Sequence, residues 1–169
     1  MTRVYVSIGS NQERESNVRA AIAALRERFG QVMLSSVYET DAVGFAGDPF
    51  LNLVAGFDTE LGLEQVMDVL HAIEVRAGRV RTEKRYGPRT MDIDVLTYGD
   101  TISDDDAVDV PRSEITQQAY VLHPLAEIAP QAQHPALGES YADLQARLKL
   151  STEGMHRVYL ALRGDGERE

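Results

Sequence analysis

Two aspartates near the middle of the chain, Asp92 and Asp94, are one residue apart and follow a dense cluster of basic side chains. Six of the chain's 17 lysines and arginines lie in this cluster: Arg76, Arg79, Arg81, Lys84, Arg85 and Arg89. Because the whole chain has a formal net charge of −10, such a local concentration of cations indicates a bound polyanion. Neighbouring carboxylates are typical ligands of divalent metals, so the combination favours a nucleoside triphosphate bound with magnesium.

A strand over residues 91–98 would place both carboxylates on one face, about 7 Å apart at Cα, with the intervening side chains in the core. Taken alone, an Asp-x-Asp pair is more often two solvated acids, and a basic run is often only a solvated surface. Here Arg89 lies three residues before Asp92, and Gly87-Pro88 predicts a turn just before Arg89. Arginine forms bidentate bonds to phosphate, which favours the phosphate-and-metal interpretation.

Composition narrows the setting of this chemistry. With 169 residues and 43% hydrophobic side chains, the chain is expected to form one domain over residues 1–163, followed by a disordered tail at 164–169. The absence of cysteine excludes disulfides and thiolate metal sites and predicts a cytoplasmic protein. The acidic balance argues against nucleic-acid and membrane partners. Neither a Walker loop nor a glycine-rich dinucleotide motif occurs, so side chains must hold the phosphates.

The elements that position these residues follow from hydrophobic periodicity. Strands are expected at 4–8, 32–38, 51–57, 91–98 and 155–162, helices at 17–29, 63–76 and 141–150, a short helical turn at 124–130, and an acidic solvated loop at 103–109. The short connections between strands disfavour a doubly wound parallel sheet. They predict an α+β sandwich in which helices pack on a mostly antiparallel sheet.

The segment Arg85-Tyr-Gly-Pro-Arg-Thr-Met-Asp-Ile-Asp-Val95 resembles the signature of the 6-hydroxymethyl-7,8-dihydropterin pyrophosphokinase family of folate biosynthesis. The resemblance covers roughly residues 1–135 through motifs in the same order: Gly9-Ser-Asn11, Phe50-Leu-Asn52, Ile73-Glu74, Gly78-Arg-Val-Arg81, Val110-Pro111 and His123-Pro-Leu-Ala-Glu-Ile-Ala-Pro130. It implies a ferredoxin-like α/β sandwich, a monomer or weak homodimer, and an enzyme that transfers diphosphate from ATP to the pterin hydroxymethyl group and releases AMP.

The family's site residues can be carried over position by position. The resemblance implies four catalytic residues, of which the two aspartates bind two Mg²⁺ ions: Arg81, Arg89, Asp92 and Asp94. Positions implied on the ATP side are Glu74, Arg79, Arg81, Arg85, Tyr86, Arg89 and Arg112. Positions implied around the pterin are Thr40, Val43, Phe50, Asn52 and Tyr120. In this scheme Phe50 and Tyr120 sandwich the ring and Asn52 reads its edge, whereas the two aromatics taken alone would be assigned to the core.

This sequence departs from the family pattern at three positions. Arg112 and Gln118 stand where a histidine and an arginine usually contact ATP, and Asp41 stands where the pterin loop often has proline. We expect Arg112 to take over an anion-binding role. Two alternatives remain open at this point: a related enzyme with altered pterin or nucleotide specificity, and a non-catalytic pterin- or nucleotide-binding protein.

Overall fold

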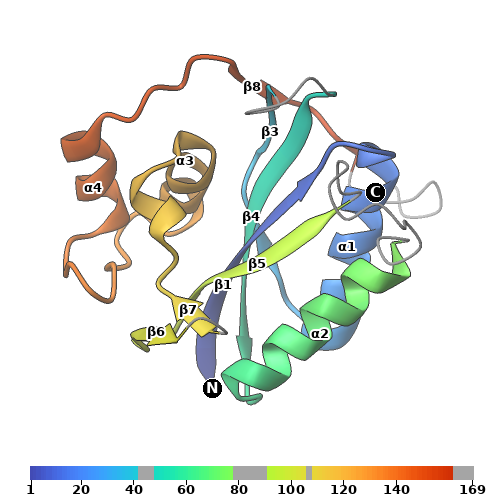
Figure 1. Cartoon of the computed structure of the whole chain (residues 1–169), viewed down its shortest axis with the longest axis horizontal. Coiled ribbons are helices and arrows are strands. Elements are labelled where there is room, and N and C mark those ends of the chain that lie inside the picture. Colours follow the sequence, from blue (N-terminus) through green and yellow to red (C-terminus); the bar gives the residue numbers. More distant parts are fainter. Residues whose placement is uncertain (42–47, 78–90, 106–107, 162–169) are drawn as a thin grey trace.

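The computed structural model describes residues 1–41, 48–77, 91–105 and 108–161. A six-stranded sheet lies between two helical layers, with α1 and α2 on one face and α3 and α4 on the other (Figure 1). In chain order the elements are β1 Thr2–Ser10, α1 Arg14–Phe29, β2 Met33–Leu34, β3 Val37–Thr40, β4 Phe50–Thr59, α2 Leu63–Arg76, β5 Asp92–Tyr98, β6 Ser103–Asp105, β7 Val108–Val110, the 3₁₀ helix η2 Ser113–Thr116, α3 Ala119–Ile128, α4 Tyr141–Leu148 and β8 Met155–Val158. The predicted α+β sandwich is confirmed.

The sheet has the strand order β5-β1-β4-β3-β8, with β2 also pairing with β4, and its pairs are antiparallel. Along the central strand β1, side chains alternate between the two faces, as the pleat requires. Val4, Val6 and Ile8 belong to the core under α1 and α2, whereas Tyr5 belongs to the core under α3 and α4. Ser7, two residues after Tyr5, therefore faces the α3 side as well.

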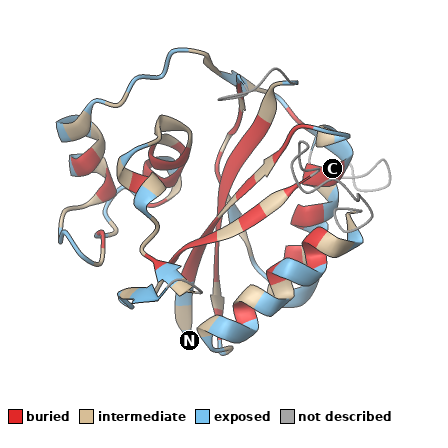
Figure 2. Ribbon diagram, in the orientation of Figure 1, coloured by how far each residue is buried: buried red, intermediate tan, exposed pale blue. Residues whose placement is uncertain are grey.

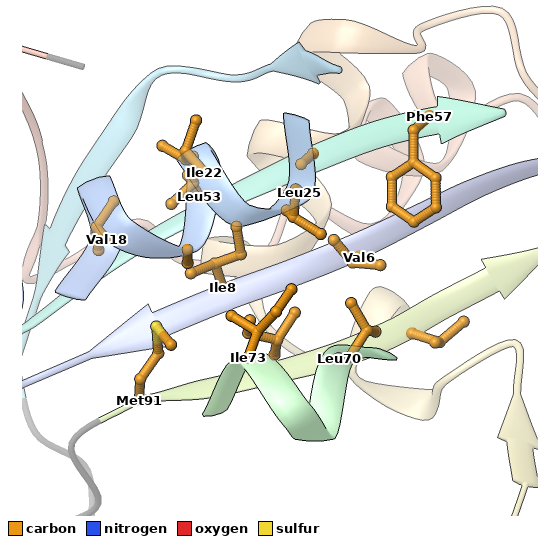
Figure 3. Packing of buried hydrophobic residues seen from close by; sticks show 14 of the residues in the cluster. Val6, Ile8, Val18, Ile22, Leu25, Leu53, Phe57, Leu70, Ile73 and Met91 are labelled. Atoms are coloured by element: carbon orange, nitrogen blue, oxygen red, sulfur yellow. The ribbon is translucent and has the colours of Figure 1, made fainter. Parts of the chain in front are cut away.

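The larger core lies between the sheet and the helix pair α1 and α2, where the buried residues gather (Figure 2). On α1, Val18, Ile22 and Leu25 recur at helical spacing and point to the sheet, as the sequence predicts (Figure 3). On the sheet side, Phe57 of β4 stacks on Phe29 at the end of α1, with ring centroids 4.0 Å apart. This packing covers one face of the sheet with α1 and α2.

A smaller core joins α3 and α4 to the opposite face of the sheet. It contains Val121, Leu122 and Leu125 of α3 and Leu144 of α4, packed with Leu96 of β5. No helix in the described part of the chain combines the length and apolar character that a membrane crossing requires.

Two expectations for the second half of the chain are wrong. The short helical turn at 124–130 is part of the longer helix α3, which contains Pro124. A proline inside a helix costs about 3 kcal/mol, but each fully buried apolar side chain of α3 contributes about 1.5–3 kcal/mol, so burial outweighs the lost backbone bond. The acidic loop at 103–109 is a hairpin of β6 and β7, in which Val110 is buried and Val108 packs against the core.

The strand expected at 32–38 is also interrupted. Its two parts, β2 and β3, both pair with β4, but the register shifts by one residue between them. At the break, the Ser35 N–H donates to the Val54 carbonyl (2.9 Å) and the Ser35 hydroxyl accepts from the Val54 N–H (2.9 Å). The serine side chain thus replaces a ladder bond at a β-bulge. The strand expected at 155–162 is confirmed over Met155–Val158, which pairs with β3.

Candidate active site

A cavity of about 250 Å³ opens on the α3 face of the sheet. Its walls come from β1, the β3–β4 pair, β5 and the segment that runs from Arg112 into α3. Seven of the residues predicted from the sequence line it: Thr40, Phe50, Asn52, Asp92, Asp94, Arg112 and Tyr120. Residues more than 70 positions apart along the chain are thus brought to one concave site.

The register of the three neighbouring strands β5, β1 and β4 explains why these side chains meet. Gly9 on β1 pairs with Asn52 of β4 on one side and with Asp92 of β5 on the other. Directly paired residues point to the same face, so the carboxamide and the carboxylate flank a position that has no side chain. A Cβ at Gly9 would lie 2.8 Å from the Asn52 Oδ1 atom. Glycine is therefore required to let the Asn52 carboxamide lie across the floor of the cavity.

Asn52 is held in one orientation by its neighbour on β3. Its Nδ2 atom donates to the Thr40 Oγ1 atom at 2.6 Å, and both residues are buried. An amide fixed in this way presents a defined donor and acceptor to a ligand, which is what recognition of a heterocycle edge needs. The structure thus brings two of the predicted pterin residues into one hydrogen-bonded pair.

Phe50 and Tyr120 enter the cavity from different elements. Phe50 is the first residue of β4 and Tyr120 lies in the first turn of α3, and both are half-buried rather than part of the sealed core. Burial raises the pKa of the Tyr120 phenol, and the carboxylates of Glu114 and Asp94 raise it further. The phenol is therefore neutral at physiological pH. The effect of Asp94 also shows that the aromatic and acidic sides of the cavity are close together.

Asp92 and Asp94 project from β5 into the cavity, while the residues beside them are buried on the other face. Ile93, between them, has an exposed fraction of 4%, as the predicted alternation requires. The backbone N–H of Ile93 donates to the Glu74 Oε2 atom of α2 at 2.7 Å. This hydrogen bond fixes β5 to α2 at the residue between the two aspartates.

Glu74 itself lies on the other side of the sheet from the cavity. Its exposed fraction is 6%, and it is not among the residues that line the cavity. The structure therefore places it where it can position β5. Direct contact with ATP, which the resemblance implied for Glu74, stays a prediction.

The donor set of the aspartate pair fits magnesium. Mg²⁺ prefers hard oxygen ligands and is usually held by one or two carboxylates together with substrate phosphates and water. Asp92 and Asp94 are both half-buried at the cavity wall and supply such carboxylates. Within the described ranges, no group of three or more histidine or acidic side chains is placed to hold a metal alone.

Among the described residues that line the cavity, Arg112 is the one with a basic side chain. Its backbone N–H donates to the Leu96 carbonyl at 3.0 Å, which ties it to the strand that carries the aspartates. Its guanidinium Nε atom lies 3.5 Å from the Glu114 Oε1 atom. Gln118, by contrast, does not line the cavity, and its carbonyl accepts the first backbone bonds of α3 from Val121 and Leu122.

The remaining predicted positions cannot be placed. Val43, Arg79, Arg81, Arg85, Tyr86 and Arg89 lie outside the described residues. Conversely, sequence reasoning missed Ser7 and Glu114, which both line the cavity. Ser7 could have been found from the predicted strand at 4–8, where it lies on the face opposite Val6 and Ile8. Glu114 lies in the short 3₁₀ helix η2 and carried no such signal.

Comparison with known proteins gives a consistent result. A model of the family described as 7,8-dihydro-6-hydroxymethylpterin-pyrophosphokinase (HPPK) matches residues 5–130. The 2-amino-4-hydroxy-6-hydroxymethyldihydropteridine pyrophosphokinase of Pseudomonas aeruginosa is 41% identical over 138 residues, which cover 79% of this chain and 84% of the relative. The protein of the same name from Methylorubrum extorquens is 38% identical over 162 residues, covering 94% of this chain and 99% of the relative.

Solved structures agree at the level of the fold. A Plasmodium falciparum HPPK-DHPS triple mutant with pteroate superimposes with a TM-score of 0.73 at 13% sequence identity. The match covers 94% of this chain and 47% of that one, so the chain spans about half the length of the solved protein. At this identity the likeness supports the arrangement of strands and helices.

Proposed function

This chain belongs to the 7,8-dihydro-6-hydroxymethylpterin-pyrophosphokinase family, and from that premise we infer that it transfers diphosphate from ATP to the hydroxymethyl group of 6-hydroxymethyl-7,8-dihydropterin in folate biosynthesis. It is an ATP-dependent diphosphotransferase whose substrates are small molecules. The observation that carries the assignment at the site is the shared cavity, which has an aromatic pair and a fixed carboxamide next to two aspartates. One half of that cavity suits a flat heterocycle and the other suits a metal-bound polyphosphate.

On the heterocycle side, Phe50 and Tyr120 would stack on the pterin ring and Asn52 would bond its edge. Aromatic stacking contributes about 0.5–1.5 kcal/mol beyond the area that it buries, which is modest, so the directional bonds must supply the specificity. The Thr40 hydroxyl fixes the Asn52 amide and thereby avoids the cost of ordering that amide when the ligand binds. We propose that the backbone near Thr40 and Val43 completes this pocket.

On the phosphate side, Asp92 and Asp94 would hold magnesium, with two ions expected. Bound magnesium supplies charge neutralisation and a fixed geometry for the phosphates. Arg112 would bind a phosphate oxygen, and its short backbone bond to β5 keeps it next to the aspartates. The resemblance assigns further phosphate contacts to Arg79, Arg81, Arg85, Tyr86 and Arg89, and these assignments remain proposals.

The reaction that we propose is an in-line displacement. The substrate hydroxyl oxygen forms a bond to the β-phosphorus of ATP and its proton passes to water, while the bond from that phosphorus to the α,β-bridging oxygen breaks, so AMP leaves. Transfers of this kind need little covalent assistance, and positioning can lower the barrier by about 7–11 kcal/mol. The chain's own contribution is therefore to align the hydroxyl and the β-phosphorus between the aromatic pair and the aspartates.

Three further features belong to the same proposal. We expect residues 1–163 to form one catalytic domain, the chain to act in the cytoplasm, and the protein to be a monomer or a weak homodimer. Size-exclusion chromatography with light scattering at several concentrations tests the last point. A stable trimer or larger ring would contradict it.

Release of AMP from ATP and magnesium, measured with and without hydroxymethyldihydropterin, tests the function. We expect AMP to appear only when the pterin is present. Tight binding of ATP and pterin without AMP would instead support a non-catalytic binding protein. AMP formed with a different pterin or a different nucleotide in preference would support a related enzyme of altered specificity.

A further inference from the structure

We propose that Glu127 is a positioning residue that seats α3 on the β3–β4 pair and so sets the width of the pterin side of the cavity. The inference rests on the proposed function, because it takes Tyr120, Phe50 and Asn52 to be the pterin-binding groups. Glu127 itself is not among the residues that line the cavity.

The carboxylate of Glu127 bridges the two elements with both of its oxygens. The Oε2 atom accepts from the Ser36 backbone N–H at 3.0 Å and from the Ser36 hydroxyl at 2.7 Å. The Oε1 atom accepts from the Tyr38 hydroxyl at 3.0 Å. Three bonds therefore connect one side chain near the end of α3 to a strand about 90 positions earlier in the chain.

On the strand side, the residues that Glu127 holds are direct neighbours of the cavity. Tyr38 pairs with Asn52 across β3 and β4, and Thr40, two residues further on, pairs with Phe50. Thr40 also accepts the hydrogen bond from the Asn52 carboxamide. A shift of β3 relative to α3 would therefore move both the carboxamide and the aromatic that we assign to the pterin.

On the helix side, Glu127 and Tyr120 are seven residues apart on α3. Two turns of an α-helix separate them, so they lie on the same face of the helix. Tyr120 faces the cavity at the start of α3. Near the end of the same helix, Glu127 accepts the hydrogen bond from Tyr38 of β3. The Tyr38 ring adds an edge-to-face contact with His123 between them, with centroids 5.6 Å apart.

The apolar packing of α3 does not by itself fix this placement. Burial of Val121, Leu122 and Leu125 holds the helix against the sheet, but the hydrophobic effect is non-directional and tolerates small slides and rotations. Hydrogen bonds to a charged acceptor are directional, so they favour one position of the helix over its neighbours. We therefore infer that the apolar residues of α3 hold the helix against the sheet. Glu127 sets the position of the helix along β3.

Loss of the carboxylate should loosen this register without unfolding the chain. Glu127 is exposed, so water can take over the bonds to Ser36 and Tyr38. We expect Glu127→Ala to raise the KM for hydroxymethyldihydropterin by about tenfold, which corresponds to about 1.4 kcal/mol. The KM for ATP should stay within about twofold of the wild-type value. The residues that we assign to ATP are not held by Glu127, because the two aspartates lie on β5 and Arg112 precedes α3. Glu127→Gln keeps one acceptor oxygen and should fall between the alanine variant and the wild type.

Glu139→Ala is the matched control. Glu139 also accepts two hydrogen bonds, from Arg147 at 2.8 Å and 2.6 Å, but it lies outside the cavity and ties a loop to α4. Glu139→Ala should alter thermal stability, but it should not raise the KM for the pterin relative to the KM for ATP. Tyr38→Phe removes the bond at Oε1 together with the hydrogen bond between the Tyr38 hydroxyl and Arg157, keeps the ring, and should raise the pterin KM in the same direction by a smaller factor.

The outcomes distinguish this inference from the proposed function. If the wild-type chain forms no pterin-dependent AMP, the function is wrong. If the wild type is active and folded Glu127→Ala leaves the pterin KM unchanged, or raises both KM values equally, the positioning role is wrong. Should Glu127→Ala fail to fold, Tyr38→Phe decides the question by the same comparison, and calorimetric titration with the pterin provides a second readout.

Discussion

Asp92 and Asp94 occupy alternate positions of β5. Asparagine has nearly the same shape as aspartate, so it can replace either residue and remove only the charge. In the proposed function each carboxylate would bind magnesium at the phosphate side of the cavity, and metal-assisted charge stabilisation is worth several kcal/mol. We therefore expect Asp92→Asn and Asp94→Asn each to lower kcat by at least about 100-fold, since 1.36 kcal/mol corresponds to tenfold. The measurement is AMP release together with a thermal melt. Near-wild-type turnover in either variant would contradict the assignment.

Gly9 provides a second test at the level of a residue. The added Cβ of Gly9→Ala would meet the Asn52 Oδ1 atom at 2.8 Å and force the carboxamide to move. We expect the pterin KM to rise by about tenfold while the ATP KM changes little, because a lost bond to a ligand costs about 1 kcal/mol or more. Steady-state kinetics with each substrate varied separately gives both constants.

Gly138→Ala is the control for that substitution. Gly138 has φ +73 and no atom within 4 Å of an added Cβ, and it lies in a loop away from the cavity. The strain of a left-handed backbone should lower its stability and leave both KM values unchanged. An equal rise of the pterin KM in the two variants would show that Gly9→Ala acts through general destabilisation.

Much of the site could be predicted residue by residue because short motifs carry it. Phe50, Asn52 and Tyr120 were assigned to the pterin from motif positions, and the structure brings all three to one cavity. Glu114 could not be predicted, because its approach to Arg112 depends on the short 3₁₀ helix η2, which has no periodic sequence pattern. For Glu74 the resemblance implied a position on the ATP side, which stays a prediction, and only the fold reveals its bond to the Ile93 backbone.

Among the elements, the loop that leads into α4 depends on a neutral histidine. The Nδ1 atom of His134 accepts from the backbone N–H groups of Ala136 and Leu137 at 3.1 Å and 3.2 Å, and burial lowers the pKa of the ring. The folded state thus favours the neutral form. The stability that this loop contributes is present above about pH 6.5, the usual pKa of an unfolded histidine, and is lost as pH falls through the lower folded-state pKa.

We expect His134→Asn to weaken that pH dependence. The asparagine Oδ1 atom can accept the same backbone bonds and does not titrate. Urea unfolding at pH 7.5 and pH 5.5 measures the effect, and the decrease in unfolding free energy between the two should be smaller in the variant. Ionisation of Glu139 does not interfere, because Arg147 holds the pKa of that carboxyl below its usual value. An unchanged difference would contradict the role of His134.

The elements that the sequence predicted well are those in which one pattern decides the outcome. α2 has the predicted bounds, Leu63–Arg76, because its apolar residues recur with a clear helical period. α3 was underestimated because Pro124 was taken as a boundary, whereas tertiary burial of its apolar residues outweighs the missing bond. The β6–β7 hairpin was missed because acidic residues outnumber the two valines that anchor it.

At the scale of the whole molecule, the chain beyond residue 130 completes the sheet. The family model matches residues 5–130, yet β8 pairs with β3 next to the cavity residue Thr40. Just after β8, Leu160 is buried with an exposed fraction of 8%, whereas the preceding Tyr159 is 92% exposed. The C-terminal segment is thus part of the core under α1 and α2 and of the sheet edge next to the cavity.

Alanine substitutions at these two neighbours test that role. Leu160→Ala should lower the free energy of unfolding by about 2–5 kcal/mol, the usual cost of truncating a buried leucine. Tyr159→Ala should change it by no more than about 0.5 kcal/mol. Chemical denaturation of both variants gives the comparison. Equal effects would mean that the segment after β8 does not belong to the core.

The most direct test of the account follows both transferred phosphates. ATP labelled at its β- and γ-phosphorus is incubated with magnesium, hydroxymethyldihydropterin and the wild-type chain, and the products are separated. We predict that both labels reach the pterin together as a diphosphate and that the remaining nucleotide is unlabelled AMP. Labelled ADP with a singly phosphorylated pterin, or label that stays in the nucleotide, would contradict the claim that this cavity carries out diphosphate transfer.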